Sequence, residues 1–275
     1  MTSRVSAPAR AVVLAAGRGT RMRRPAPAVP LDDAQRRMAD RGLKPLVPFH
    51  GHAYIDFVLS ALADGGCREV CIVVPRGDDA IRAHYAAIGT RRIRLSFAAQ
   101  DEPLGSAHAL LTAEAFVGDD EFLVVNADNV YPAAAVAALL DARGNALAGF
   151  RRSTLIAGGI PAERIAAYAL VRADGEGFLA EIVEKPGPEE LSRFGDDALV
   201  SMTLWRFTPA ILDACRSIAP SARGEYELPD AVAYATRELG ARFRVVPVEG
   251  GVLDLSCRED IPFVAERLRG VRVEL

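Results

Sequence analysis

The sequence predicts an α/β fold in which a Rossmann-like, mostly parallel mixed sheet carries helices on both of its faces. Short runs of Val, Ile and Leu alternate with segments whose apolar residues recur at helical spacing, and this alternation is typical of βαβ units. The runs themselves are apolar throughout, as in buried strands. Beyond Gly149 the pattern loosens into runs that indicate antiparallel or mixed strands.

The first half of the chain, residues 9–150, has the most regular alternation. In the segment 54–63, Ile55, Val58 and Leu62 share one helical face, and two glycines follow it and end the helix. The same reasoning gives expected strands at 11–14, 70–74, 93–99 and 122–125, and expected helices at 34–40, 54–63, 79–88, 106–116 and 133–140.

The second half, residues 151–275, is expected to cover the ligand. Its expected strands lie at 168–172, 178–183, 199–207 and 243–248, and its expected helices at 209–215, 228–239 and 259–268. We expect both halves to form one domain over residues 1–275. The segment 23–42 is rich in proline at its start and in charged residues after that. We interpret it as an insertion into the first half.

Composition limits the classes of partner. The chain has 275 residues, of which 50% are hydrophobic, and a net charge of −3, so no dominant basic field exists to attract a nucleic acid or an anionic membrane. Small molecules are the expected ligands. The four cysteines lack metal spacing and are expected to be reduced packing residues, which favours the cytoplasm. Residues 1–10 are polar, and no apolar run approaches the ~18 residues of a membrane span.

A small-residue turn follows the first expected strand. Gly17 and Gly19 allow the backbone to approach a ligand closely, and successive N–H groups with the charge of Arg21 suit a phosphate. The turn is not a P-loop, because Gly19 is followed by Thr20 rather than by Lys and a hydroxyl residue. It is not a dinucleotide-binding turn either, because Met22 stands where the third glycine belongs. The alternative that this turn is purely structural and binds no ligand is not excluded by the sequence.

Polar residues also follow other apolar runs, where ligands of parallel sheets bind. Asp128 follows the run at 122–125 and offers one carboxylate to a hard cation, although an Asx-turn would place it there equally well. Asp254, which follows Val252 and Leu253, is the candidate second carboxylate. Lys185, which precedes a proline, could equally be a surface lysine paired with Glu184.

Taken in order, these segments resemble the signature of the sugar-1-phosphate nucleotidylyltransferases, also called nucleotide-sugar pyrophosphorylases. The matching residues are 14–22, Lys44 with Pro45, Gln100 with 103–105, Asp128 with Asn129, 184–186 and Asp254. The likeness runs from Ala11 to about Leu268, and the segments 105–109, 201–207 and 223–231 look most similar to the bacterial UTP–glucose-1-phosphate branch. It implies a GT-A-like fold of the nucleotide-diphospho-sugar transferase type, in which an NTP and a sugar 1-phosphate give an NDP-sugar and pyrophosphate with Mg²⁺.

The resemblance also implies a role for each matching residue. Binding of the nucleotide would fall to Leu14, Ala16, Gly17, Gly19, Thr20, Gln100, Gly105 and Ser106. Binding of the sugar phosphate would fall to Asn129, Glu184, Lys185 and Thr203, binding of Mg²⁺ to Asp128 and Asp254, and catalysis to the cations Arg21, Lys44 and Lys185. The second half, 151–275, would then be the sugar-phosphate-binding half, and 9–150 the nucleotide-binding half.

Such an assembly needs no catalytic histidine. A phosphate monoester has its second pKa near ~6, so the attacking oxygen is already anionic and the obstacle is repulsion between two polyanions. The side chain of Gln100 can donate to and accept from uracil or thymine, which favours UTP or dTTP as the nucleotide. A hexose 1-phosphate is the acceptor that the resemblance favours. GTP, CTP or ATP with an unusual sugar or cyclitol phosphate stays open, as do a GT-A-type glycosyltransferase, a non-catalytic sensor of nucleotide sugars and a homo-oligomer.

Overall fold

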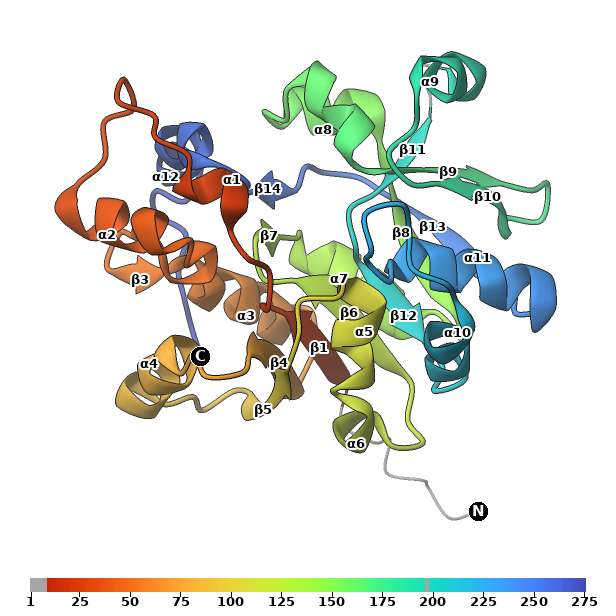
Figure 1. Cartoon of the computed structure of the whole chain (residues 1–275), viewed down its shortest axis with the longest axis horizontal. Coiled ribbons are helices and arrows are strands. Elements are labelled where there is room, and N and C mark those ends of the chain that lie inside the picture. Colours follow the sequence, from red (N-terminus) through yellow and green to blue (C-terminus); the bar gives the residue numbers. More distant parts are fainter. Residues whose placement is uncertain (1–8, 196–197) are drawn as a thin grey trace.

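The computed structural model describes residues 9–195 and 198–275 and is built around one mixed sheet (Figure 1). The strand order is β10 (Leu179–Val183), β9 (Ala169–Ala173), β11 (Leu199–Ser201), β8 (Ala146–Arg151), β12 (Trp205–Phe207), β6 (Phe122–Asn126), β1 (Arg10–Leu14), β4 (Glu69–Pro75) and β5 (Arg94–Gln100). A tenth strand, β13 (Arg244–Val248), pairs parallel with β8. The predicted Rossmann-like α/β class is confirmed. The start of the chain, where no apolar signal segment was predicted, lies outside the described residues up to residue 8.

The central strands run parallel, and their carboxyl ends lie level with one another. β1 lies between β4 and β6, and Leu14 at its end is level with Val73 and with Asn126. On the next strand out, Gln100 is level with Pro75. The carboxyl ends of β1, β5 and β6 therefore open onto the same rim, as expected for a ligand-binding edge.

Helices cover both faces of the sheet, as predicted (Figure 1). Along β1, Ala11 and Val13 point into one core and Val12 into the other, and all three are fully buried. This alternation with a period of two residues is what places a hydrophobic layer on each side. One layer includes α3 (Tyr54–Asp64), α4 (Ala80–Ile88) and α7 (Ala133–Asp141), and the other includes α5 (Ser106–Leu111), α6 (Glu114–Val117), α10 (Ile211–Ser217) and α11 (Leu228–Glu238).

Three predicted elements differ from the structure. The helix expected at 106–116 is two helices, because the chain leaves α5 at Thr112, whose hydroxyl donates to the carbonyl of Ala109 over 2.7 Å. The strand expected at 199–207 is β11 and β12, separated by Thr203 with a φ of 60°. The helix expected at 259–268 starts as the 3₁₀ turn η3 (Arg258–Asp260) before α12 (Ile261–Arg267).

The insertion is ordered and packs on the first turn of the chain after β1. It contains α2 (Asp33–Arg41), which confirms the expected helix, and it joins α1 (Thr20–Arg23) to the 3₁₀ turn η1 (Lys44–Leu46). Asp32 caps α2 in a reciprocal capping box with Gln35, and Gly42 ends the helix at a φ of 74°. The insertion thereby positions Lys44 near the carboxyl end of β1.

The remaining elements are short. They are β2 (Pro48–Phe49), β3 (His52–Ala53), β7 (Asn129–Val130), β14 (Leu253–Asp254), α8 (Arg152–Ala157), the 3₁₀ turn η2 (Ala162–Ala167) and α9 (Pro188–Phe194). The four cysteines are free, as predicted, and three of them are buried. No helix in 9–195 or 198–275 combines the length and apolar character needed to cross a bilayer.

Candidate active site

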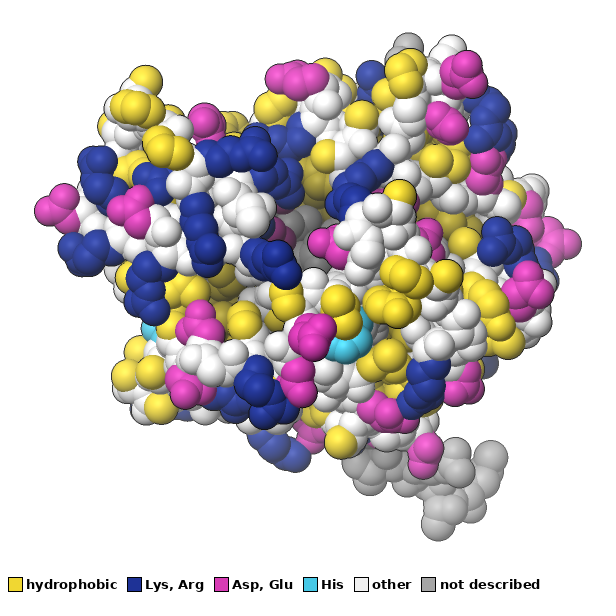
Figure 2. Space-filling view, viewed as in Figure 1, with side chains coloured by type: hydrophobic (Ala, Val, Ile, Leu, Met, Phe, Trp, Pro, Cys, Tyr) yellow, Lys and Arg dark blue, Asp and Glu magenta, His cyan; other side chains and the backbone are white. Residues whose placement is uncertain are grey.

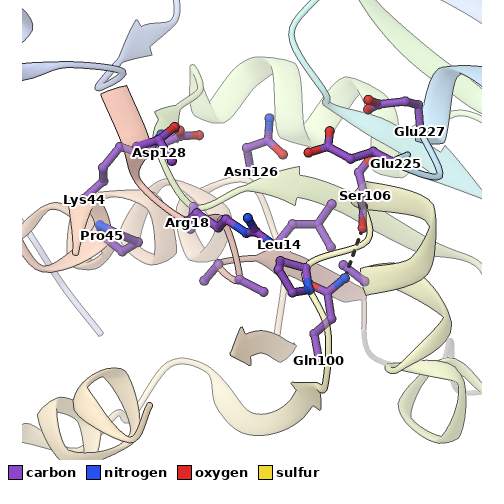
Figure 3. Close-up of a pocket in the computed structure, with 18 residues that line it drawn as sticks. Leu14, Arg18, Lys44, Pro45, Gln100, Ser106, Asn126, Asp128, Glu225 and Glu227 are labelled. Carbon is purple, nitrogen blue, oxygen red and sulfur yellow. Dashed lines mark hydrogen bonds and ion pairs between the residues drawn. The ribbon is translucent and has the colours of Figure 1, made fainter. Parts of the chain in front are cut away.

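A cavity of about 460 Å³ lies at the carboxyl ends of the parallel strands (Figure 3). Many residues predicted from the sequence line it, namely Leu14, Ala16, Gly17, Thr20, Lys44, Gln100, Gly105, Ser106 and Asp128. In Figure 3, Lys44 and Asp128 lie at one end of the cavity, and Glu225 and Glu227 lie at the other. The cavity therefore joins the turn after β1, the end of β5 and the end of β6.

The glycine turn supplies the cavity with backbone and with one cation. Arg18 lines the cavity and is exposed, whereas Arg21 on α1 is exposed but does not line it. A Cβ on Gly19 would lie 2.1 Å from the carbonyl oxygen of Gly42, and the φ of Gly19 is +61°. The close approach of the insertion therefore explains this glycine, which stands outside the cavity wall. A Cβ added at Gly17 would meet nothing within 4 Å, so the space beside its backbone is open to a ligand.

The insertion also makes this side of the cavity basic. Figure 2 shows Lys and Arg side chains gathered over the region of α1 and α2, beside a hollow in the surface. The arginines of the insertion are Arg23, Arg24, Arg36, Arg37 and Arg41, and Arg18 and Arg21 come just before it in the chain. Such a concentration of positive charge attracts a polyanion toward the cavity.

The opposite wall is fixed by the segment after Gln100. Gly105 has a φ of +103°, and a Cβ there would lie 2.5 Å from the carbonyl oxygen of Tyr226. The backbone N–H of Leu228 donates to the hydroxyl of Ser106 over 2.8 Å. Because the segment 225–227 is held against this turn, its glutamates face the cavity.

Gln100 is 4% exposed, and its amide NH₂ is already engaged. It donates to the carbonyl of Gly105 over 3.2 Å, a contact drawn as the dashed line in Figure 3, and it lies 3.0 Å from Nδ1 of His108. His108 on α5 is therefore in contact with Gln100. With its NH₂ held inside the protein, Gln100 offers its carbonyl oxygen to a ligand.

The two predicted metal carboxylates lie together. Asp254 belongs to β14, which pairs with β7 so that Asp254 is opposite Asn129. In the amide orientation that satisfies both carboxylates, the side-chain nitrogen of Asn129 donates to Oδ1 of Asp128 over 3.1 Å and to Oδ1 of Asp254 over 3.2 Å. Asp254 therefore reaches the site on a two-stranded ribbon, and the expectation that it ends a strand of the main sheet is wrong.

Each carboxylate also has cationic or hydroxyl partners. Asp128 forms an ion pair with Lys44. Asp254 accepts a hydrogen bond from the hydroxyl of Tyr168 over 3.0 Å and one from Nη1 of Arg164 over 3.3 Å. Burial, and after it the charge of Asp128, raises the pKa of Asp254 above its usual value. Bringing these two carboxylates together thus has an electrostatic cost that a divalent cation would offset.

This donor set fits Mg²⁺, which proteins bind through one or two carboxylates and substrate phosphates. Asp128 and Asp254 would hold the ion. Within the part of the chain that the structure describes, no group of three or more His, Cys, Asp or Glu side chains is arranged for a metal. The remaining ligands would therefore be phosphate oxygens and water.

The residues predicted to bind the sugar phosphate stand beside the cavity or beneath it. Lys185 follows β10 with a φ of 48°, and its Nζ lies 3.5 Å from Glu184. Neither lines the cavity, but both act on the charge of Glu227, which does. Burial raises the pKa of Glu227, the charges of Arg223 and Lys185 lower it, and Glu184 raises it further. These groups therefore form one charged cluster next to the cavity.

Asn129 and Thr203 do not line the cavity. Asn129 is only 3% exposed and is not part of the cavity wall. Thr203 is half-buried, and its carbonyl accepts a hydrogen bond from the hydroxyl of Tyr131 over 3.1 Å. In the protein as described, both hold neighbouring groups in place rather than face the cavity.

Several cavity-lining residues were not predicted from the sequence to be site residues. They are Ala15, Arg18, Pro45, Pro103, Ala109, Asn126, Ala127, Glu225 and Glu227. Arg18 carried a usable signal, because it lies between two glycines of a turn expected to bind phosphate. The two glutamates lie within 223–231, a segment that contributed to the resemblance but received no role.

The family model for nucleotidyl transferases matches residues 10–247. The UTP–glucose-1-phosphate uridylyltransferase AglF of Haloferax volcanii is 30% identical over 260 residues, which cover 94% of this chain and 96% of that one. A glucose-1-phosphate thymidylyltransferase of Streptomyces griseus is 30% identical over 223 residues, 81% of this chain and 56% of that one. The crystal structure of a UDP-glucose pyrophosphorylase complexed with UDP-glucose shares the fold, with a TM-score of 0.73, 19% identity and coverage of 96% and 100%.

The match to the family model spans most of the chain, and the relative from H. volcanii is aligned over nearly its whole length. Both agree with a cavity at the carboxyl ends of parallel strands that combines a glycine turn, cations and Asp128, with Asp254 held beside Asp128 by Asn129. The chain belongs to the nucleotidyl transferase family and is an enzyme of the sugar-1-phosphate nucleotidyltransferase class.

Proposed function

We propose that the protein catalyses the Mg²⁺-dependent transfer of a nucleotidyl group from an NTP to a sugar 1-phosphate, giving an NDP-sugar and pyrophosphate. One observation carries the proposal: Arg18, Lys44, Asp128 and the open backbone of Gly17 converge on one cavity, and Asn129 holds Asp254 beside Asp128. A triphosphate needs such a combination, because its charge must be neutralised on several oxygens at once.

The nucleotide would occupy the end of the cavity formed by the glycine turn and Gln100. Gly17 would present backbone N–H groups to the phosphates, and Arg18 and Lys44 would supply charge. The carbonyl oxygen of Gln100 would accept a hydrogen bond from the base. The N3–H of uracil or thymine is a donor of this kind, so we propose UTP or dTTP as the nucleotide.

The reaction requires positioning and charge neutralisation rather than proton transfer. The phosphate of the sugar 1-phosphate is largely ionised at neutral pH, so its oxygen can attack the α-phosphorus without a general base. Lys44 and Arg21 would neutralise the departing pyrophosphate, and Lys185 would hold the sugar phosphate. Mg²⁺, when bound, would supply further positive charge at the phosphate oxygens.

The sugar would bind toward the cluster of Glu184, Lys185, Glu225 and Glu227. Glu225 and Glu227 line the cavity, and carboxylates are strong acceptors for sugar hydroxyl groups. A hexose 1-phosphate fits this combination of a cation for the phosphate and acceptors for the ring hydroxyls. We place the reaction in the cytoplasm, since all four cysteines are free.

A matrix of substrates tests the proposal. UTP, dTTP, GTP, CTP and ATP are each incubated with hexose, hexosamine and cyclitol 1-phosphates in the presence of Mg²⁺, and released pyrophosphate is measured. We expect release only when both substrates and the ion are present, and the highest rates with UTP or dTTP. No pyrophosphate above the no-acceptor background for any pair would overturn the proposed function.

A further inference from the structure

The guanidinium of Arg164 lies against Asp254, one of the two carboxylates expected to hold the metal ion. It belongs to η2, in the second half of the chain, and its Nη1 lies 3.3 Å from Oδ2 of Asp254. Its Nη2 lies 2.8 Å from Oδ1 of Asp260, and only 18% of its side chain is exposed. One guanidinium thus bridges two buried carboxylates.

Each carboxylate of the pair has one cationic partner. Lys44 is paired with Asp128, and Arg164 is hydrogen-bonded to Asp254. Asp260, the other partner of Arg164, also accepts hydrogen bonds from the backbone N–H groups of Ser256 and Cys257, each over 2.8 Å. Asp260 is therefore fixed by the backbone and holds Arg164 in place against Asp254.

A divalent ion that binds this pair experiences the charge of Arg164 at close range. The guanidinium and the ion would share Asp254 as a ligand, so the two positive charges repel each other in a partly buried site. The triphosphate of a nucleotide brings enough negative charge to outweigh this repulsion. The protein alone therefore holds the ion less tightly than the two carboxylates would allow.

We propose that Arg164 is a positioning residue that orients Asp254 and weakens the binding of free divalent ions, so that the ion is held tightly only together with a nucleoside triphosphate. This inference rests on the proposed function, which supplies both the ion and the nucleotide. It concerns the affinity for the ion, and activity is not needed to test it.

Titration of the whole protein with Mn²⁺, followed by the electron paramagnetic resonance signal of the free ion, tests the inference. Arg164→Met removes the charge and keeps most of the side-chain length, Arg164→Gln removes the charge and keeps hydrogen bonding, and Arg164→Lys keeps the charge. Arg172→Met is the matched control, because Arg172 pairs with Glu181 on the neighbouring strands rather than with the carboxylate pair.

Without nucleotide, we expect Arg164→Met and Arg164→Gln to lower the Kd for Mn²⁺ about tenfold or more. Arg164→Lys and Arg172→Met should keep the Kd of the unmodified protein. The melting temperature gives a second readout, because an ion that binds more tightly raises it further at equal concentration. If the variant with Met at position 164 does not fold, Arg164→Gln, which keeps an amide NH₂ as a hydrogen-bond donor, gives the same comparison.

Equal or weaker Mn²⁺ binding in a folded neutral variant would overturn the role of Arg164. That failure is separable from failure of the proposed function. If the unmodified protein releases pyrophosphate while the neutral variants keep its Kd for Mn²⁺, only the inference about Arg164 is wrong. If no substrate pair yields pyrophosphate, the proposed function is wrong.

Discussion

Asp254 lies directly opposite Asn129 in the antiparallel pair of β7 and β14. The backbone N–H of Leu255 also donates to the carbonyl oxygen of Asp128 over 2.9 Å, so the two segments are bound on both sides of the pairing. A late segment of the chain thereby places a carboxylate beside Asp128, which comes from the first half. The short ribbon, rather than the main sheet, determines the spacing of the two carboxylates.

Removal of the carboxylate of Asp128 should abolish most of the activity. In Asp128→Asn we expect pyrophosphate release to fall by about 100-fold or more, because the ion loses a charged ligand and Lys44 loses its partner. Steady-state assays with saturating substrates measure the change. Asp141→Asn, an exposed carboxylate at the end of α7, is the control and should keep its rate. Activity within a few-fold of the unmodified enzyme in Asp128→Asn would contradict this role.

Arg18 and Arg21 should affect different kinetic constants. Arg18 lines the cavity, so Arg18→Ala should raise the KM for the NTP by about 10- to 100-fold, the loss of one charge-assisted hydrogen bond. Arg21 does not line the cavity, and its predicted role is to neutralise the departing pyrophosphate. Arg21→Ala should therefore lower kcat rather than raise the KM for the NTP.

Arg24→Ala is the control for both variants, because Arg24 is exposed on the same segment and outside the cavity. It should leave KM and kcat within about twofold. A KM for the NTP that is unchanged in Arg18→Ala would remove Arg18 from the binding site.

Gly19 should be needed for stability. Gly19→Ala forces a Cβ to within 2.1 Å of the Gly42 carbonyl at a φ of +61°, so we expect a loss of about 2–4 kcal/mol. At about 2–4 °C per kcal/mol, thermal unfolding should shift by roughly 4–16 °C. Gly17→Ala, whose Cβ meets nothing within 4 Å, should unfold near the unmodified temperature. Equal melting temperatures for both variants would contradict the packing account.

Glu184 should make stability depend on pH. Burial raises the pKa of this carboxyl in the folded protein above the ordinary value of 4.5, so above that pH the folded state binds more protons than the unfolded state. The free energy of unfolding should therefore fall as the pH rises from about 4.5 through the higher pKa that Glu184 has in the folded protein. Urea unfolding between about pH 4 and pH 8 should show a shallower decline for Glu184→Gln than for the unmodified protein. A steeper decline in the variant would show that the sign is wrong.

Much of the fold could be predicted because its strands are unmistakable in the sequence. The runs that became β1, β4 and β6 are almost wholly apolar and are buried along nearly their whole length. β8 was missed because Ala146–Arg151 contains two alanines and a glycine, residues that strands disfavour, although it lies in the middle of the sheet. Its neighbours stabilise it, and that information is not local.

The candidate site could be predicted in part for a similar reason. Turns at strand ends, such as the one that includes Gly17, carry a local signal, and the register of the sheet then brings them to one edge. The partners of Asp254 carry no local signal in the sequence. Arg164 and Tyr168 contact Asp254 only because the chain around η2 folds against β14. The cavity-lining glutamates depend likewise on the contact between Gly105 and Tyr226.

The fate of the α-phosphate tests the central claim most directly. The unmodified enzyme is supplied with UTP or dTTP carrying ³²P at the α-position, a sugar 1-phosphate that supports pyrophosphate release, and Mg²⁺. We expect all transferred label in the nucleotide sugar and none in pyrophosphate, because the bond broken lies between the α- and β-phosphates. Label-free nucleotide sugar, or no labelled product despite consumption of the nucleotide, would contradict transfer of a nucleotidyl group at this site.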